Sequence, residues 1–197
     1  MIGLYEIGGV GKTALMKRIN EELCCTNHGF NVVIWMVVSK QVNQDRIQDV
    51  TRKMLDIEDN SWKGWSWDER IHHLCEGLNM KKFVLLIDDL WWRLDLSKIG
   101  VPRPSPNNGS KFVFTTWWNQ VCDQMVVDKT FKIQSLTPKE ALELFENNVS
   151  KSIIYSHLDI LELTKDIARE CEGLPLALII VGRAMVSKRI PLSGNMC

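Results

Sequence analysis

Ile7-Gly8-Gly9-Val10-Gly11-Lys12-Thr13 is the stretch that decides the fold class of this chain. It lies between a short apolar run and an amphipathic segment, and its Gly-x-Gly-Lys-Thr core is typical of a phosphate-binding P-loop. Glycines lack a Cβ, so the backbone N–H groups can fold inward as a cradle for an anion, while the following helix presents its positive end. In this pattern Lys12 reaches the β- and γ-phosphates, and the Thr13 hydroxyl can bind Mg²⁺.

The residue just before the glycines departs from the full pattern. A glycine is required five residues before Gly11, and Glu6 stands there instead. If the position needs left-handed backbone, a side chain there costs about 1–2 kcal/mol. If the carboxylate faces the phosphates, repulsion at roughly 4 Å costs about 4 kcal/mol at an effective dielectric constant of ~20. Either effect would weaken nucleotide binding about tenfold or more, and replacement by glycine would then tighten it.

A second motif follows further along the chain. The most hydrophobic run, Phe83-Val84-Leu85-Leu86-Ile87, ends abruptly at Asp88-Asp89. A buried strand that ends in two carboxylates downstream of a P-loop is the Walker B arrangement, and ligands of open α/β sheets bind at the carboxyl ends of the strands. Asp88 is therefore the candidate Mg²⁺ ligand, and Asp89 the candidate that orients an attacking water. The alternative is that both are acidic caps of a following helix.

Thr115 and Thr116 end another buried run, which begins at Lys111. At the same edge of the sheet their hydroxyls would be able to sense a γ-phosphate or the water bound to Mg²⁺. The alternative is simple β-branched packing at the end of a strand.

The order of the apolar segments predicts the fold. Strand-like and helix-like segments alternate up to about Gln134, which predicts an α/β fold: the parallel five-stranded sheet of a P-loop NTPase, flanked by helices. The predicted strands are 2–5, 31–38, 83–87, 111–114 and 130–134, and helices are predicted after the P-loop, after the cap Asn43, and after capping boxes that begin at Ser66 and Thr137.

From Ser135 onward the pattern is helical, with helices near 158–172 and over 175–186. We expect a P-loop nucleotide-binding domain over 1–135, a partial helical subdomain over 136–187 and an irregular tail over 188–197. The helical part is too short for a comfortable core of its own, so we expect it to pack on the first domain or to be truncated.

Composition excludes several classes of function. The 24 basic and 24 acidic residues cancel, which argues against a nucleic-acid or membrane-surface partner. The longest apolar run is too short for a transmembrane segment, and Met1 leads directly into a predicted strand, so we expect no signal peptide. The six cysteines form no C-x-x-C pair and read as reduced thiols, which favours a cytoplasmic location.

Taken together, the motifs resemble those of the NB-ARC nucleotide-binding domain of plant disease-resistance proteins. A tryptophan at the position of Trp91, shortly after the Walker B acids, resembles the pattern of the subclass with coiled-coil N-terminal domains. The matching stretches cover nearly the whole chain in the right order: Gly8 to Leu15, Phe30 to Lys40, Lys82 to Trp91, Gly109 to Thr116 with Val121-Cys122, Leu136 to Phe145, and Glu170 to Ala177.

The resemblance implies a signalling module that rests with ADP bound and is activated by exchange for ATP, with weak ATPase activity at most. It implies that the strand ending at Thr115-Thr116 lies between the P-loop and Walker B strands, and that Pro175 contacts adenine. By itself Pro175 is equally well explained as a proline at a helix start. The implied cofactors are ADP or ATP with Mg²⁺, and the implied nucleotide-binding residues are Gly8, Gly9, Val10, Gly11, Lys12, Thr13, Ala14, Thr115, Thr116 and Pro175.

The implied partners are the other domains of a resistance receptor, or related receptors. No coiled coil, winged-helix unit or leucine-rich repeat is recognisable in this sequence, so we expect a fragment or a truncated gene product.

Two tryptophans depart from the family pattern. Trp117 and Trp118 stand where the family has Arg-Ser, and an indole cannot replace a guanidinium fork that senses a γ-phosphate. This departure, together with Glu6, supports an alternative function: a nucleotide-dead interaction module that keeps the fold. A third hypothesis, an unrelated P-loop kinase or DNA-processing ATPase, is disfavoured by the neutral charge and by the lack of an acceptor-substrate constellation.

Overall fold

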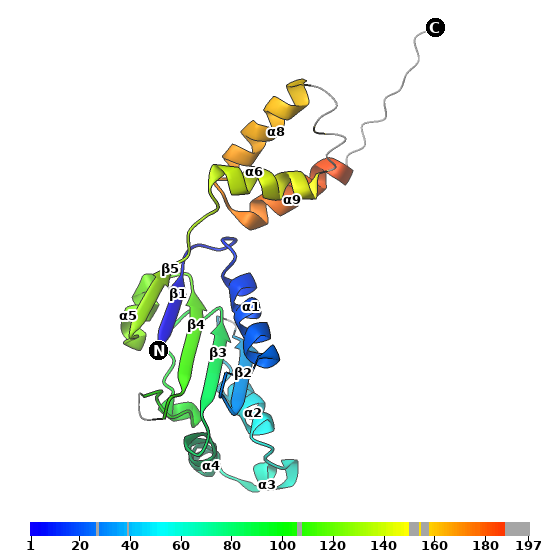
Figure 1. Ribbon diagram of the computed structural model, residues 1–197. Coiled ribbons are helices and arrows are strands. Elements are labelled where there is room, and N and C mark those ends of the chain that lie inside the picture. The colour runs from blue at the N-terminus through cyan, green and yellow to red at the C-terminus, as the bar shows by residue number, and fades with distance from the viewer. Residues whose placement is uncertain (27, 39, 106–107, 150–153, 155–157, 188–197) are drawn as a thin grey trace. The chain divides into compact units, whose positions relative to one another are not determined.

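The computed structural model describes residues 1–26, 28–38, 40–105, 108–149, 154 and 158–187, so the predicted tail over 188–197 lies outside the described residues. The chain divides into two compact units (Figure 1). The first, here called the sheet unit, comprises Met1–Ile7 and Lys12–Ile133, and the second, the helical unit, comprises Gly8–Gly11 and Gln134–Cys197. The glycines of the P-loop therefore group with the helical residues, which sequence reasoning did not predict.

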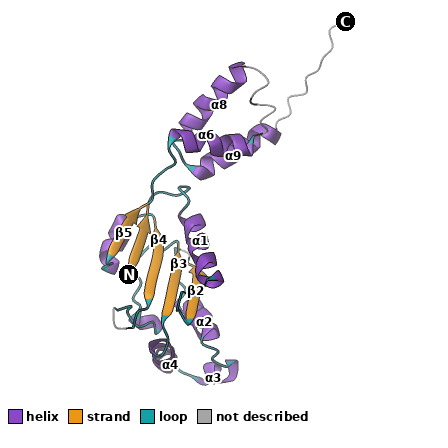
Figure 2. Ribbon diagram, in the orientation of Figure 1, coloured by secondary structure: helices purple, strands orange, loops and turns teal. Residues whose placement is uncertain are grey.

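The sheet unit is built on five parallel strands, which Figure 2 draws side by side in orange. Their order is β2-β3-β4-β1-β5, so β4 lies between the strand that feeds the P-loop and the Walker B strand. The predicted α/β fold with a parallel five-stranded sheet is confirmed, and so is the implied place of β4. The strands are β1 Ile2–Tyr5, β2 Val32–Val37, β3 Phe83–Asp88, β4 Lys111–Thr116 and β5 Lys129–Lys132.

Helices cover both faces of this sheet. On one face Met16 packs against Leu86 and the other side chains of that face, and on the opposite face Leu85 and Ile87 belong to a larger core with Leu78. Every residue of β3 is buried, as expected for a central parallel strand covered on both sides. The helices are α1 Lys12–Cys25, α2 Gln44–Met54, α3 Asp59–Gly64, α4 Trp67–Asn79, the 3₁₀ turn η1 Ser97–Ile99 and α5 Asn119–Met125.

The predicted caps are confirmed. The Asn43 side chain accepts a hydrogen bond from the Arg46 N–H at the start of α2, and Ser66 forms a reciprocal capping box with Glu69 at the start of α4. Sequence reasoning missed α3 and α5, which are six and seven residues long and have no side-chain cap. Short helices of this kind depend on packing, such as the burial of Trp62, more than on local signals.

The helical unit contains α6 Pro138–Asn148, α8 Leu158–Glu170 and α9 Pro175–Ser187, which pack around Phe145 and Leu178. The capping box at Thr137, with proline in the first turn, is confirmed. Helix α8 ends two residues before the predicted position, because Glu172 and Gly173 are left-handed with φ of 50° and 69°. A Cβ on Gly173 would lie 2.3 Å from the Leu136 carbonyl oxygen, so this turn requires glycine.

Strand β5 also differs slightly from the prediction, ending at Lys132 rather than Gln134. The Ile133 N–H still donates to the Tyr5 carbonyl, but Gln134 already belongs to the helical unit. Among the described residues, none of the helices is both long and apolar enough to cross a bilayer.

Candidate functional site

The candidate site of the sheet unit lies at the carboxyl ends of three neighbouring strands. β3 ends at Asp88, β4 ends at Thr116, and β1 runs into Glu6 and Ile7, while Lys12 begins α1. Because parallel strands all end at the same edge, this topology brings the Walker B acids and the P-loop lysine together.

Thr115 connects the two Walker B acids. Its side chain is 1 % exposed; the hydroxyl donates to Asp88 Oδ1 at 2.6 Å and accepts from the Asp89 N–H at 2.8 Å. The Thr115 carbonyl accepts from the Leu90 N–H at 2.8 Å. Thr116 is fully buried, and its hydroxyl accepts from the Trp118 N–H at 3.3 Å. Both hydroxyls thus hold protein groups in place, and their contact with a phosphate stays a prediction.

Asp88 and Thr13 offer the oxygen donors that a hard cation such as Mg²⁺ prefers. Asp88 is 2 % exposed and its Oδ1 already accepts from Thr115, whereas Thr13 is exposed in the first turn of α1. Within the part of the chain that the structure describes, no cluster of three His, Cys, Asp or Glu side chains suits a metal ion. A bound Mg²⁺ would therefore need oxygens from the nucleotide and from water as well, as Mg²⁺ sites usually do.

Asp89 is held in an unusual conformation. Its φ is 65°, in the left-handed region that costs a residue with a Cβ about 1–2 kcal/mol. Two hydrogen bonds hold the residue there: its N–H donates to Thr115, and the indole Nε1–H of Trp91 donates to Asp89 Oδ2 at 2.9 Å. The second Walker B carboxylate therefore has a fixed orientation before any ligand binds.

Lys12 is buried beside these acids, with 7 % of the residue exposed. Its ammonium donates to the Ile7 carbonyl at 2.9 Å and to the Glu6 carbonyl. Burial lowers the pKa of Lys12, and the nearby charges of Asp89, Glu6 and Asp88 oppose that shift. The P-loop lysine and both Walker B carboxylates thus lie within electrostatic range of one another.

Glu6 is accommodated without the expected backbone strain. The described non-glycine residues with positive φ are Asp56, Asp89, Val126 and Glu172, and Glu6 is not among them. Its carboxylate accepts from the Ile7 N–H at 3.0 Å and lies 3.4 Å from the Lys132 ammonium of β5. The Ile7 hydrogen bond holds the pKa of Glu6 below its ordinary value. Burial opposes this shift, and the positive charges of Lys132 and Lys12 support it.

Replacing Glu6 with glutamine should change how stability depends on pH. A carboxylate with a lowered pKa contributes stability above its unfolded-state pKa of about 4.3, and loses it as the pH falls through the folded-state value. The difference in free energy of unfolding between wild type and Glu6→Gln should therefore be largest near neutral pH and should decrease as the pH falls below the unfolded-state pKa of Glu6. Urea unfolding at several pH values measures this difference.

The partner variant Lys132→Gln serves as the matched comparison, because it removes one of the groups that stabilise the Glu6 charge. The difference in free energy of unfolding between wild type and Lys132→Gln should also decrease at low pH, but by a smaller amount than for Glu6→Gln. A difference between wild type and Glu6→Gln that stays constant with pH would contradict this account.

In the helical unit, the glycine turn of the P-loop lies against the start of α9. Gly9 and Gly11 have φ of 85° and 104°, values that favour glycine. The Gly9 carbonyl accepts from the Leu176 N–H at 3.2 Å, and a Cβ on Gly9 would lie 3.3 Å from Leu176 Cβ. Leu176 follows Pro175, so the structure brings the Gly-Leu-Pro-Leu motif to the glycine turn, while the adenine contact of Pro175 stays a prediction.

The remaining predicted binding residues lie in the glycine turn and in the first turn of α1. Val10 is buried and Gly8 half-buried in the turn, and Ala14 is exposed in the first turn of α1.

Sequence reasoning missed a pair of stacked indoles, Trp91 and Trp117, at the carboxyl ends of β3 and β4. Their ring centroids lie 5.3 Å apart at an interplanar angle of 29°. The Lys12 ammonium lies 5.6 Å from the centroid of Trp117, and the Lys40 ammonium 4.6 Å from that of Trp91. Each tryptophan closely follows the end of one of two adjacent strands, β3 and β4, and that shared position was the available signal.

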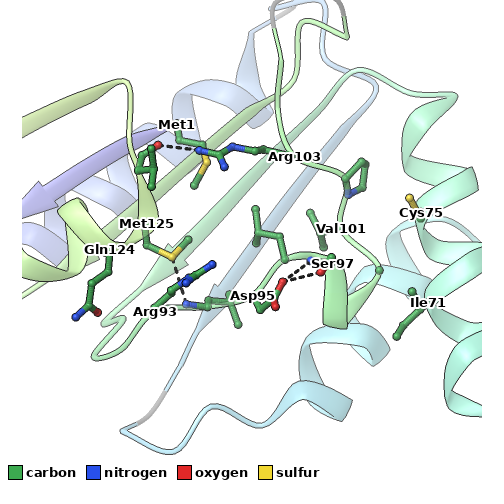
Figure 3. A pocket seen from close by; sticks show the side chains of 15 residues that line it. Met1, Ile71, Cys75, Arg93, Asp95, Ser97, Val101, Arg103, Gln124 and Met125 are labelled. Atoms are coloured by element: carbon green, nitrogen blue, oxygen red, sulfur yellow. Dashed lines mark hydrogen bonds between the residues drawn. The ribbon is translucent and has the colours of Figure 1, made fainter.

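A separate cavity of about 470 Å³ lies elsewhere in the sheet unit (Figure 3). Its walls come from α4, the segment 93–103 and α5, and they are mostly apolar, with Arg93, Asp95 and Arg103 among them. None of the predicted site residues lines it, so this cavity is distinct from the Walker B edge.

Comparison with known proteins gives concordant matches. The model of the NB-ARC domain family matches residues 1–153. A probable disease resistance protein of Arabidopsis thaliana is 46 % identical over 95 % of this chain and 22 % of its own length. A second one from the same plant is 41 % identical over 97 % of this chain and 51 % of its own length. The chain thus spans between about a fifth and about half of these curated relatives.

Among solved structures, this chain resembles a signal transduction ATPase with numerous domains that carries a tetratricopeptide repeat sensor, from Pyrococcus horikoshii. The TM-score is 0.53 at 16 % identity, over 90 % of this chain and 26 % of that chain. At this identity the likeness concerns the fold alone, and it agrees with the α/β P-loop NTPase fold described above.

Proposed function

The chain belongs to the NB-ARC domain family, and on that premise we propose that it is an ADP/ATP-binding switch module of a plant disease-resistance protein, which hydrolyses ATP slowly at most. Family and fold imply nucleotide binding in general. The observation that supports the finer proposal is the placement of Lys12 within electrostatic range of Asp88 and Asp89. A buried ammonium beside two oriented carboxylates is what a magnesium–nucleotide site needs.

Each residue has a defined role in this proposal. By the P-loop pattern of the sequence, the N–H groups of Gly8–Gly11 would bind phosphate and Lys12 would donate to it. Asp88 and Thr13 would hold Mg²⁺, which would supply positive charge to the phosphates. Thr115 positions both acids. Asp89 would orient water, but one of its oxygens already accepts from Trp91, which supports slow hydrolysis.

The remaining parts of the proposal concern context. We propose a cytoplasmic location, and as partners the other domains of a resistance receptor or related receptors. The relatives named above are disease resistance proteins that extend well beyond the region matched by this chain, which supports such partners.

A second candidate function is a nucleotide-dead interaction module. One observation favours it: the Lys12 ammonium already donates to the Glu6 and Ile7 carbonyls and has the Trp117 ring beside it. A lysine engaged in this way has only one of its three N–H donors left for a phosphate.

Thermal unfolding with and without Mg-ADP separates the two functions. A ligand that binds only the folded protein stabilises it by about 2.7 kcal/mol at a hundredfold excess over the dissociation constant. The switch module should therefore melt at a clearly higher temperature with millimolar Mg-ADP. A folded protein whose unfolding temperature does not change under these conditions would be the interaction module.

A further inference from the structure

The surroundings of the Lys12 ammonium leave it little freedom to take a phosphate. An ammonium has three N–H donors, and the Glu6 and Ile7 carbonyls accept two of them. The ring of Trp117 is a further neighbour, with its centroid 5.6 Å from Nζ, within the range of a cation–π contact. A phosphate that takes the third N–H donor therefore approaches an ammonium that has the Trp117 ring as a neighbour.

The Trp117 ring is held at this place by its neighbours. It stacks on Trp91, whose indole N–H is fixed by the hydrogen bond to Asp89 and whose ring contacts the Lys40 ammonium. Trp117 is 39 % exposed, so its ring is accessible to a ligand from solvent. The face of an aromatic ring is electrically negative, which favours an ammonium and disfavours phosphate oxygens.

We propose that Trp117 is a residue that lowers the affinity of the Lys12 ammonium for phosphate groups. The indole face stabilises the ammonium and disfavours the approach of phosphate oxygens to it. The proposal rests on the proposed function in one respect, that Lys12 is the phosphate-binding residue. From the range of cation–π energies, removal of the ring should tighten phosphate binding by about 2- to 30-fold.

Trp118 provides a matched control. It is the adjacent residue, it is 56 % exposed, and it is also an indole, while the cation–π contact of Lys12 is with Trp117. Trp117→Leu removes the ring and keeps an apolar side chain, Trp117→Phe keeps a ring face, and Trp118→Leu removes a neighbouring indole.

Calorimetric titration of these variants with inorganic pyrophosphate and with Mg-ADP tests the proposal. Trp117→Leu should bind both ligands about 2- to 30-fold more tightly than wild type, Trp117→Phe should stay close to wild type, and Trp118→Leu should stay within about twofold. An affinity of Trp117→Leu equal to or weaker than that of wild type would overturn the proposal, and the proposed nucleotide binding would still stand.

The opposite failure is also recognisable. If wild type binds neither ligand but Trp117→Leu does, the ring blocks the site and the wild-type protein is the interaction module. If none of the proteins binds, both proposals fail.

NMR tests the contact between Lys12 and Trp117 separately. The ring current should shift the Lys12 ε-methylene protons upfield in wild type and in Trp117→Phe, and this shift should be lost in Trp117→Leu.

Discussion

Replacing Lys12 with alanine should abolish measurable binding of Mg-ADP. The substitution removes the one P-loop side chain that carries positive charge to the phosphates, and hydrogen bonds to charged groups contribute more than neutral ones. Loss of a desolvated charge–charge hydrogen bond typically costs about 2–5 kcal/mol, which corresponds to a factor of about 30 to several thousand in affinity. Isothermal titration calorimetry measures the loss directly.

The control for this experiment is Lys17→Ala, which removes an exposed lysine of the same helix. It should bind Mg-ADP within about twofold of wild type, because an exposed charge at the surface is screened by water and salt. Circular dichroism verifies that both variants are folded, since Lys12 also bonds the Glu6 and Ile7 carbonyls. Equal binding by Lys12→Ala and wild type would refute the proposed function.

Thr115→Val should destabilise the protein by about 2–5 kcal/mol, although the two side chains have nearly the same shape. The hydroxyl serves two buried groups at once: it donates to the Asp88 carboxylate and accepts from the Asp89 N–H. Valine leaves both without this partner, and one of them is a carboxylate that is only 2 % exposed. Leaving a buried polar group unsatisfied costs about 1–3 kcal/mol, and more for a charge.

Thr115→Ser keeps the hydroxyl and loses only a methyl group, so its loss of stability should be clearly smaller. Asp88→Asn in the Thr115→Val background tests the carboxylate part, because the double variant no longer buries an unsatisfied charge. Urea unfolding measures all of these free energies. If Thr115→Val is as stable as Thr115→Ser, then the hydroxyl is dispensable and the geometry of the two acids has another cause.

Much of the fold follows from local sequence signals. The capping boxes at Ser66 and Thr137 specify helix starts through contacts three residues apart, and such contacts are visible in the sequence itself. The run that forms β3 is apolar at every position before Asp88, which distinguishes a strand covered on two faces. The order of strands, in contrast, came only from the resemblance to a family, because pattern alone does not say which strands are neighbours.

The parts that sequence did not predict depend on residues distant in the chain. From the sequence, Glu6 is expected to repel phosphate or to strain the backbone. In the structure its carboxylate lies 3.4 Å from the Lys132 ammonium of β5. Trp117 reads as the loss of an arginine, whereas the structure gives its ring two partners, Trp91 and Lys12. The grouping of Gly8–Gly11 with the helical unit likewise depends on the distant Leu176.

The position of β1 within the sheet has a consequence for synthesis on the ribosome. β1 is made well before its hydrogen-bonding neighbours, which are β4, where Ile2 pairs with Val113, and β5, where Ile2 pairs with Lys129. At typical elongation rates of ~5–20 residues per second, the strand waits several seconds before either neighbour leaves the exit tunnel. In the order of synthesis, β2 and β3 are the first neighbouring strands available to pair. We expect the sheet to be complete only after β4 has added beside β3, β1 beside β4, and finally β5 beside β1.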